Sequence, residues 1–138
     1  MMRFLFCSLL LLGACSGGSS AGPTASTPSE AQPAATVRNV DVATLKADLD
    51  RHAVPLLVDV RSPEEFAGGH VPGARNVPID QLQARLSEFG TAAAEVYVIC
   101  QGGGRSAAAS TTLAAKGLHP VNVTGGTSAW KAAGFPVE

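Results

Sequence analysis

An excess of charge of either sign is absent from this chain. Its 138 residues contain 10 Lys and Arg against 11 Asp and Glu, which gives a net charge of −1 at pH 7. Such a balance indicates no basic surface, so neither nucleic acid nor an anionic membrane surface is expected as a partner. The histidines, His52, His70 and His119, also lack the spacing of metal ligands, so we expect no metal site built on them.

A long hydrophobic run is absent as well. The apolar stretch at residues 4–12 follows Arg3 and is shorter than the roughly 20 residues that cross a bilayer. A positive charge followed by a short apolar run is the layout of a secretory signal peptide. We predict that residues 1–14 form this signal peptide and are removed on export.

The end of this segment, Leu12-Gly13-Ala14-Cys15, resembles the bacterial lipobox. In that motif the cysteine thiolate accepts a diacylglyceryl group, and the peptidase needs small side chains just before it. We therefore expect an exported protein with a lipidated Cys15 as its first residue and a membrane contact through the lipid anchor only. Ser16 favours the periplasmic face of the outer membrane. The alternative is an ordinary secretory signal in which Cys15 is incidental.

Large apolar side chains are absent from residues 16–36, where Gly, Ser, Ala, Thr and Pro predominate and Glu30 is the only charge. Such a segment cannot bury enough surface to offset the entropy of ordering it. We predict that residues 15–36 form the lipidated cysteine and a flexible tether. The remaining residues, 37–138, have the usual size of one compact domain.

Cysteine is scarce, with three in the whole chain. Cys7 would leave with the signal and Cys15 would carry the lipid, so the mature domain would keep only Cys100. An intramolecular disulfide is then excluded. A lone thiol in an oxidising compartment is exposed to oxidation, so its presence indicates that Cys100 has a function.

Apolar runs that suit buried strands alternate with helical patterns along residues 37–138. This alternation predicts an α/β fold with a central, mostly parallel sheet of about five strands and helices on both faces. Ligands in such folds bind at the carboxyl ends of strands, where Cys100 is placed. The expected strands lie near residues 37–40, 54–60, 75–77, 95–100 and 121–123, and the expected helices start at Asp41 and Ser62 and cover residues 80–86, 105–117 and 128–134.

A glycine-rich loop follows the strand that ends on Cys100. Three consecutive glycines let backbone N–H groups converge on one point, and the following helix directs its positive end there. Both effects predict a lowered pKa and a nucleophilic thiolate at Cys100. Arg105 adds a fork of donors for an oxyanion. The loop reads Cys100-Gln101-Gly102-Gly103-Gly104-Arg105-Ser106, and we predict that Cys100 is catalytic, that residues 101–105 bind substrate and that Ser106 supports them.

This loop resembles the active-site loop of the rhodanese superfamily, in which a cysteine and an arginine bracket four residues. Counted from the cysteine, the fourth place of that loop is a glycine, here Gly103. Two further blocks, residues 56–79 and 121–138, resemble the same family. The resemblance implies a rhodanese-like fold and a sulfurtransferase that moves sulfane sulfur through a persulfide on Cys100. The donor would be a small sulfur-containing anion, such as thiosulfate, or a persulfide; the acceptor would be a thiol or cyanide, and no cofactor is needed. Asp59 and Arg61 match the family's Asp-x-Arg element and are expected to brace the loop.

Two alternatives remain open at this point. Phosphatases and arsenate reductases of the same fold also use a cysteine and an arginine, but their loop has five residues between the two instead of four. A non-catalytic binding or sulfur-relay module is the second alternative. Other residues suggest structural roles: His70 in a turn, Trp130 and Phe135 in packing, and the glycines at 125 and 126 in a turn.

Overall fold

The computed structural model describes residues 35–91 and 94–138. The predicted signal peptide, Cys15 and the tether as far as residue 34 lie outside the described residues. The strands are β1 (Arg38–Val40), β2 (Leu57–Asp59), β3 (Arg75–Asn76), β4 (Glu95–Ile99) and β5 (His119–Val123); the α-helices are α1 (Val42–Asp50), α2 (Pro63–Ala67), α3 (Gly104–Ala114) and α4 (Gly126–Ala132); and two 3₁₀ helices are η1 (Ile79–Gln81) and η2 (Leu86–Phe89).

The strands form one parallel sheet in the order β1-β5-β4-β2-β3. This confirms the predicted α/β fold with a parallel sheet of about five strands. Because all neighbours are parallel, their carboxyl ends meet at one edge of the sheet. Strand β4 is the central strand, and Cys100 follows its last residue, Ile99, so the cysteine lies at the middle of that edge.

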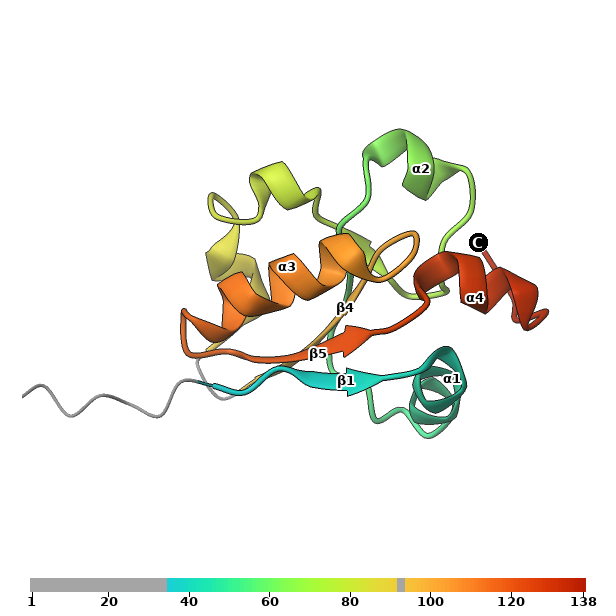
Figure 1. Cartoon of the computed structure of the whole chain (residues 1–138), viewed down its shortest axis with the longest axis horizontal. Coiled ribbons are helices and arrows are strands. Elements are labelled where there is room, and N and C mark those ends of the chain that lie inside the picture. Colours follow the sequence, from blue (N-terminus) through green and yellow to red (C-terminus); the bar gives the residue numbers. More distant parts are fainter. Residues whose placement is uncertain (1–34, 92–93) are drawn as a thin grey trace, which may run out of the picture.

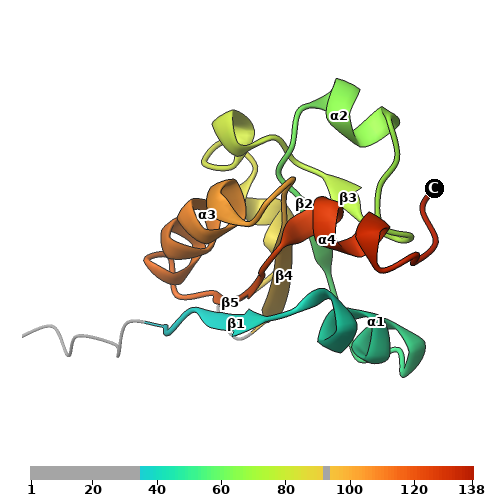
Figure 2. The same ribbon diagram turned by 45° about the vertical axis from the view of Figure 1, so that its right-hand side comes forward.

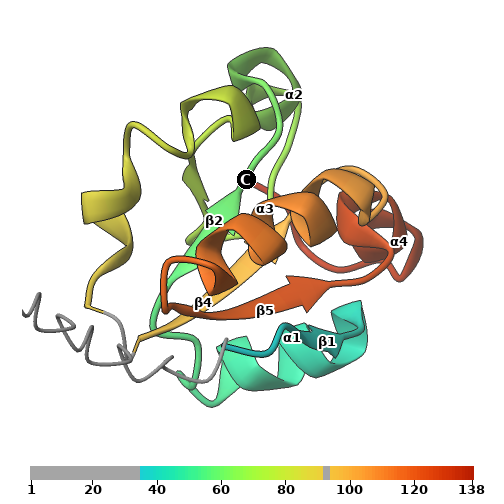
Figure 3. The same ribbon diagram turned by 60° about the vertical axis from the view of Figure 1, so that its left-hand side comes forward.

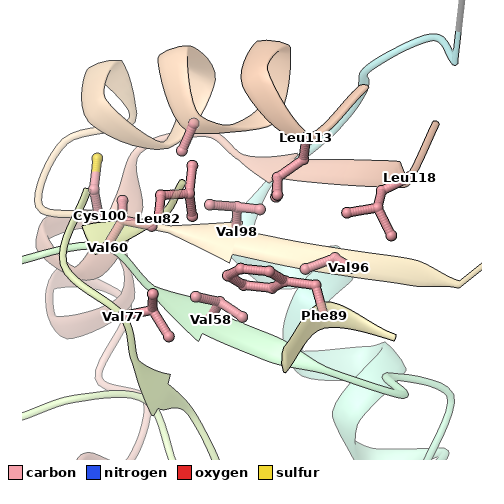
Figure 4. Packing of buried hydrophobic residues seen from close by; sticks show 11 residues of the cluster. Val58, Val60, Val77, Leu82, Phe89, Val96, Val98, Cys100, Leu113 and Leu118 are labelled. Atoms are coloured by element: carbon pink, nitrogen blue, oxygen red, sulfur yellow. The ribbon is translucent and has the colours of Figure 1, made fainter. Parts of the chain in front are cut away.

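Side chains of β4 alternate between the two faces of the sheet. On one face, Val96 and Val98 pack toward α3 and the 3₁₀ helices (Figure 4). On the other face, Tyr97 and Ile99 pack with residues of α1 and α4. Figures 1 and 3 show α3 over one face of the sheet and α1 on the other. The prediction of helices on both faces is therefore confirmed. Trp130 of α4, expected to pack in the core or at its edge, is 1% exposed and lies in the core.

The first two α-helices start at the expected positions, and side-chain caps fix both starts. The Asp41 carboxylate accepts a hydrogen bond from the Thr44 N–H at 2.8 Å. Ser62 and Glu65 form a capping box around Pro63, each side chain accepting from the other residue's backbone N–H. This box fixes the start of α2, which follows the carboxyl end of β2 and rises beyond the edge of the sheet (Figure 2).

The helix predicted over residues 80–86 is wrong. The chain instead forms η1 and η2, with i→i+3 bonds such as that from the Leu82 N–H to the Ile79 carbonyl at 3.3 Å. Seven residues are too few to hold an α-helix by propensity alone. Burial of Leu82 and Phe89 and the bond from Arg85 to the Asn76 carbonyl decide the local path instead.

None of the helices in residues 35–91 and 94–138 has the length and apolar character needed to cross a membrane.

Candidate active site

Cys100 lies where β4 ends and the loop to α3 begins. Its side chain is buried, with 1% of the residue exposed, and its sulfur points toward the loop that leads into α3 (Figure 4). The backbone N–H of Gly103 donates to the sulfur at an N···S distance of 3.1 Å. Helix α3 starts at Gly104, so the positive end of its dipole lies at the same loop.

The pKa of the Cys100 thiol reflects two opposed effects. Burial raises it, because a thiolate is poorly solvated in the protein interior. Hydrogen bonds from the Ser106 hydroxyl and from the backbone N–H groups of Ser106, Gly103 and Gly102 outweigh burial and hold the pKa below its ordinary value. The Ser106 hydroxyl also lies 3.0 Å from the Gly103 carbonyl, so its single proton has two acceptors within reach. The net effect favours the thiolate, which is the nucleophilic form.

The three loop glycines are not equivalent. Gly103 has a φ of +102°, and a Cβ there would lie 3.3 Å from the Gly125 nitrogen. Gly102 and Gly104 lie outside the left-handed region, and a Cβ at either would have no neighbour within 4 Å. Only Gly103 therefore has a backbone conformation that requires glycine.

The Gln101 side chain faces α4 instead of the centre of the loop. Its Nε2 donates to the Ser128 hydroxyl at 3.0 Å, and its Oε1 accepts from the Thr127 hydroxyl at 3.1 Å. The Arg61 guanidinium lies 3.5 Å from the same Oε1. A substrate contact of Gln101, which the sequence predicts, would therefore come from its backbone.

The start of α4 is bound to the backbone of the cysteine loop by hydrogen bonds. The Thr127 N–H donates to the Cys100 carbonyl at 2.8 Å, and the Ser128 N–H donates to the Gln101 carbonyl at 3.0 Å. A Cβ at Gly126 would lie 2.3 Å from the Cys100 carbonyl oxygen, so only glycine fits at this contact. The turn expected at Gly125 and Gly126 is thereby confirmed, with φ values of +77° and +58°.

Asp59 and Arg61 form a buried ion pair next to the loop, with exposures of 0% and 2%. The Arg61 Nε lies 2.9 Å from Asp59 Oδ2, and its Nη2 lies 2.7 Å from the same oxygen. Nη2 also donates to the Gly69 carbonyl at 3.0 Å. Together with the Gln101 contact, this pair connects β2, the end of α2 and the cysteine loop.

Arg105 is paired with a carboxylate from a distant part of the sequence. Its Nη1 and Nη2 each lie 2.7 Å from an oxygen of Glu65. Pairing with Arg105 lowers the pKa of Glu65 from 4.5 to about 2. The capping box identifies Glu65 as a helix-capping residue, but no sequence signal connects it with a partner 40 positions later.

A cavity of about 220 Å³ opens beside Arg105, between the start of α2 and η1. Besides Arg105, its polar lining residues are Ser62, Asp80 and Gln81. No group of three or more His, Cys, Asp or Glu side chains that could hold a metal occurs in the described part of the chain. The cavity is lined by Val60, Ser62, Pro63, Pro78, Ile79, Asp80, Gln81 and Arg105.

Residues 41–133 match the family model of the rhodanese-like domain. The chain belongs to the rhodanese-like family. Among its relatives, a sulfurtransferase of Allochromatium vinosum is 34% identical over 102 residues, which are 73% of this chain and 94% of that protein. Thiosulfate sulfurtransferase 16, a chloroplastic protein of Arabidopsis thaliana, is 40% identical over 94 residues, 59% of this chain and 78% of the relative. Protein YqhL of Bacillus subtilis is 45% identical over 75 residues, 54% of this chain and 59% of YqhL.

Solved structures show the same fold. A rhodanese-related protein from Thermoplasma volcanium has a TM-score of 0.67 and 34% sequence identity, covering 73% of this chain and 97% of its own. This similarity confirms the rhodanese-like fold. The sulfurtransferase relatives support a rhodanese-type enzyme at the level of the family. The roles of individual loop residues in a reaction stay predictions.

Proposed function

We propose that this rhodanese-like domain carries sulfane sulfur as a persulfide on Cys100 and transfers it to a thiol or cyanide acceptor. The observation that supports this most directly is the position of the Cys100 sulfur. It lies at the carboxyl end of the central strand, accepts the Gly103 N–H at 3.1 Å and has a lowered pKa. A thiolate held this way is a nucleophile, and the same N–H groups would hold a terminal persulfide anion.

The reaction has two balanced steps. In the first, the Cys100 thiolate bonds to the outer sulfur of the donor, the donor's S–S bond breaks, and its electron pair leaves with the rest of the donor; from thiosulfate the leaving group is sulfite. In the second, the acceptor attacks the outer sulfur of the persulfide, and Cys100 recovers its electron pair as a thiolate. No electron is gained or lost overall.

The loop length favours sulfur over phosphate. Four residues separate Cys100 from Arg105, and a loop of this size suits a single sulfur atom better than a tetrahedral oxyanion. A sulfur-relay or binding module without turnover would share the first step only. The full chain therefore needs a test that separates adduct formation from turnover.

Mass spectrometry after treatment with thiosulfate provides this test. We expect the protein to gain one sulfur atom on Cys100 and to release sulfite continuously once cyanide is added. The Cys100→Ala variant should show neither. An adduct without turnover would support a relay module, whereas hydrolysis of a phosphate ester with no sulfur adduct would support a phosphatase. A Cys100→Ala protein as active as the wild type would overturn the proposal.

We also propose that the domain acts outside the cytoplasm, attached through a lipid on Cys15 to the periplasmic face of the outer membrane. The support is the sequence around Cys15 and the absence of bulky apolar residues from 16 to 36. Donors and acceptors would then be the small sulfur compounds and thiols of that compartment.

A further inference from the structure

Both arginines beside the cysteine loop are matched by carboxylates. Arg61 is paired with Asp59 in the protein interior. Arg105 is paired with Glu65 through two contacts of 2.7 Å each, one from either end nitrogen of the guanidinium. Each pair has a net charge of zero, so neither supplies an uncompensated positive charge to an arriving anion.

The cavity beside the loop likewise offers no uncompensated positive charge. Among its lining residues, all in the described part of the chain, Arg105 is the only cation and Asp80 the only anion. Since Glu65 already compensates Arg105, the exposed Asp80 carboxylate leaves this side of the site with a net negative charge. The cavity borders the cysteine loop at Arg105, so a second anionic group of a donor that lies here meets repulsion, which a donor without such a group avoids.

Glu65 is held in this position by its place in α2. Its Oε2 accepts the Ser62 N–H at 3.3 Å, and the Ser62 hydroxyl accepts the Glu65 N–H at 3.3 Å. With a pKa of about 2, the carboxylate stays charged throughout the pH range in which the thiolate is formed. Glu65 is therefore charged and paired with Arg105 in the folded domain, with both side chains partly exposed, at 39% for Arg105 and 36% for Glu65.

We propose that Glu65 sets the donor specificity of the site: by keeping Arg105 paired, it disfavours thiosulfate and favours organic persulfides, which lack an anionic group beyond the sulfur that is transferred. The inference rests on the proposed function. The loop N–H groups can hold one sulfur anion, but the sulfonate group of thiosulfate needs a separate cation, which Glu65 occupies. Glu65 is thus a positioning residue that acts through Arg105.

The favoured step balances without a further reactant. The Cys100 thiolate bonds to the outer sulfur of R–S–SH, the S–S bond breaks, and R–S⁻ leaves with the electron pair and takes up the proton that the new persulfide releases. Cys100 keeps the transferred sulfur as a persulfide. No oxidant or reductant is consumed.

The test compares two donors, thiosulfate and 2-hydroxyethyl persulfide, in three forms of the full chain. Glu65→Gln keeps an acceptor for the capping box but releases Arg105. Glu64→Gln is the matched control. It removes the same charge from an exposed residue one position before Glu65. We expect Glu65→Gln to raise kcat/KM for thiosulfate about fivefold, through KM, and to change the persulfide value less than about twofold. Its KM for thiosulfate should also become more sensitive to salt.

The wild-type protein should show the higher kcat/KM with the organic persulfide. Equal or better use of thiosulfate by the wild type would overturn the inference even if Glu65→Gln did not fold. An unchanged donor ratio in Glu65→Gln, or the same change in Glu64→Gln, would also overturn it. These results differ from failure of the proposed function, in which neither donor adds sulfur to Cys100 in any form.

Discussion

At the scale of single residues, the loop depends on one glycine of three. Gly103→Ala places a side chain in the left-handed region, at a cost of roughly 1–2 kcal/mol, and brings a Cβ to 3.3 Å from the Gly125 nitrogen. We expect this variant to be less stable by about that amount and to form the Cys100 persulfide at least about tenfold more slowly, since the Gly103 N–H is displaced from the sulfur. Urea unfolding and the rate of adduct formation measure the two effects.

Gly102→Ala is the matched control, because a Cβ there meets no atom within 4 Å and the backbone is not left-handed. It should stay within about 1 kcal/mol of the wild type in stability. If both alanine variants slowed adduct formation equally, the special position of Gly103 would be refuted.

The lowered pKa of Cys100 has a direct consequence for its reactivity. Hydrogen bonds to the thiolate outweigh burial, so the folded protein holds the thiolate at a pH where an unfolded chain is still protonated. The rate of alkylation by iodoacetamide, plotted against pH, should therefore have its midpoint below that of the same protein in urea. Ser106→Ala removes a hydroxyl donor and should move the folded midpoint upward. A folded midpoint at or above the unfolded one would contradict this account.

The sequence predicted that Cys100 follows a strand and that a glycine turn leads into a helix, because a strand, a run of glycines and a helix start are local features. It did not predict where the Gln101 and Arg105 side chains point. Their partners, Ser128 and Glu65, lie 27 and 40 positions away, and only the folded sheet brings them to the loop. Whether a side chain points toward a site or away from it depends on its tertiary contacts, and the composition of the loop does not reveal these.

At the scale of elements, the junction between α4 and the cysteine loop is the tightest contact of the site. Gly126→Ala would place a Cβ 2.3 Å from the Cys100 carbonyl oxygen, where backbone on both sides must move. We expect a loss of at least about 2 kcal/mol in unfolding free energy and a large loss of adduct formation. Differential scanning calorimetry and mass spectrometry of the thiosulfate-treated protein provide the measurements.

Gly134→Ala is a suitable control for this variant. Gly134 also has a positive φ, +71°, but a Cβ there has no neighbour within 4 Å. It should lose only the roughly 1–2 kcal/mol of backbone strain and keep its reactivity toward thiosulfate. Retention of full reactivity by Gly126→Ala would show that the α4 junction does not position Cys100.

The strands and most helices were predictable from their patterns, and one segment was not. Short buried runs such as β4 have few alternatives to a central strand, and Asp41 and Ser62 mark helix starts by their capping chemistry. Over residues 79–89 the choice between α and 3₁₀ turns depends on how Leu82 and Phe89 reach the core. That choice depends on the distance to the sheet, which a seven-residue periodicity does not specify.

At the scale of the whole molecule, the parallel sheet explains why the site combines distant segments. Cys100 follows β4, Asp59 ends β2 and Arg61 lies just beyond it, and these strands are neighbours in the sheet. Helix α4 follows β5 on the other side of β4 and reaches the same edge. A parallel arrangement thus converts strand ends that are far apart in sequence into one site, and this was deducible from the alternation of strands and helices.

The place of the domain in the cell is a separate prediction, carried by residues 1–36. If Cys15 bears a lipid, Cys15→Ala expressed in a bacterium should move the protein from the membrane to the soluble fraction and abolish its labelling by palmitate, because one thioether and its acyl chains supply the whole attachment. Cys7→Ala is the matched control: it removes a thiol from the predicted signal peptide and should leave both fractionation and labelling unchanged. Membrane association of Cys15→Ala equal to that of the wild type would refute lipidation there, and equal loss in Cys7→Ala would indicate a general export defect.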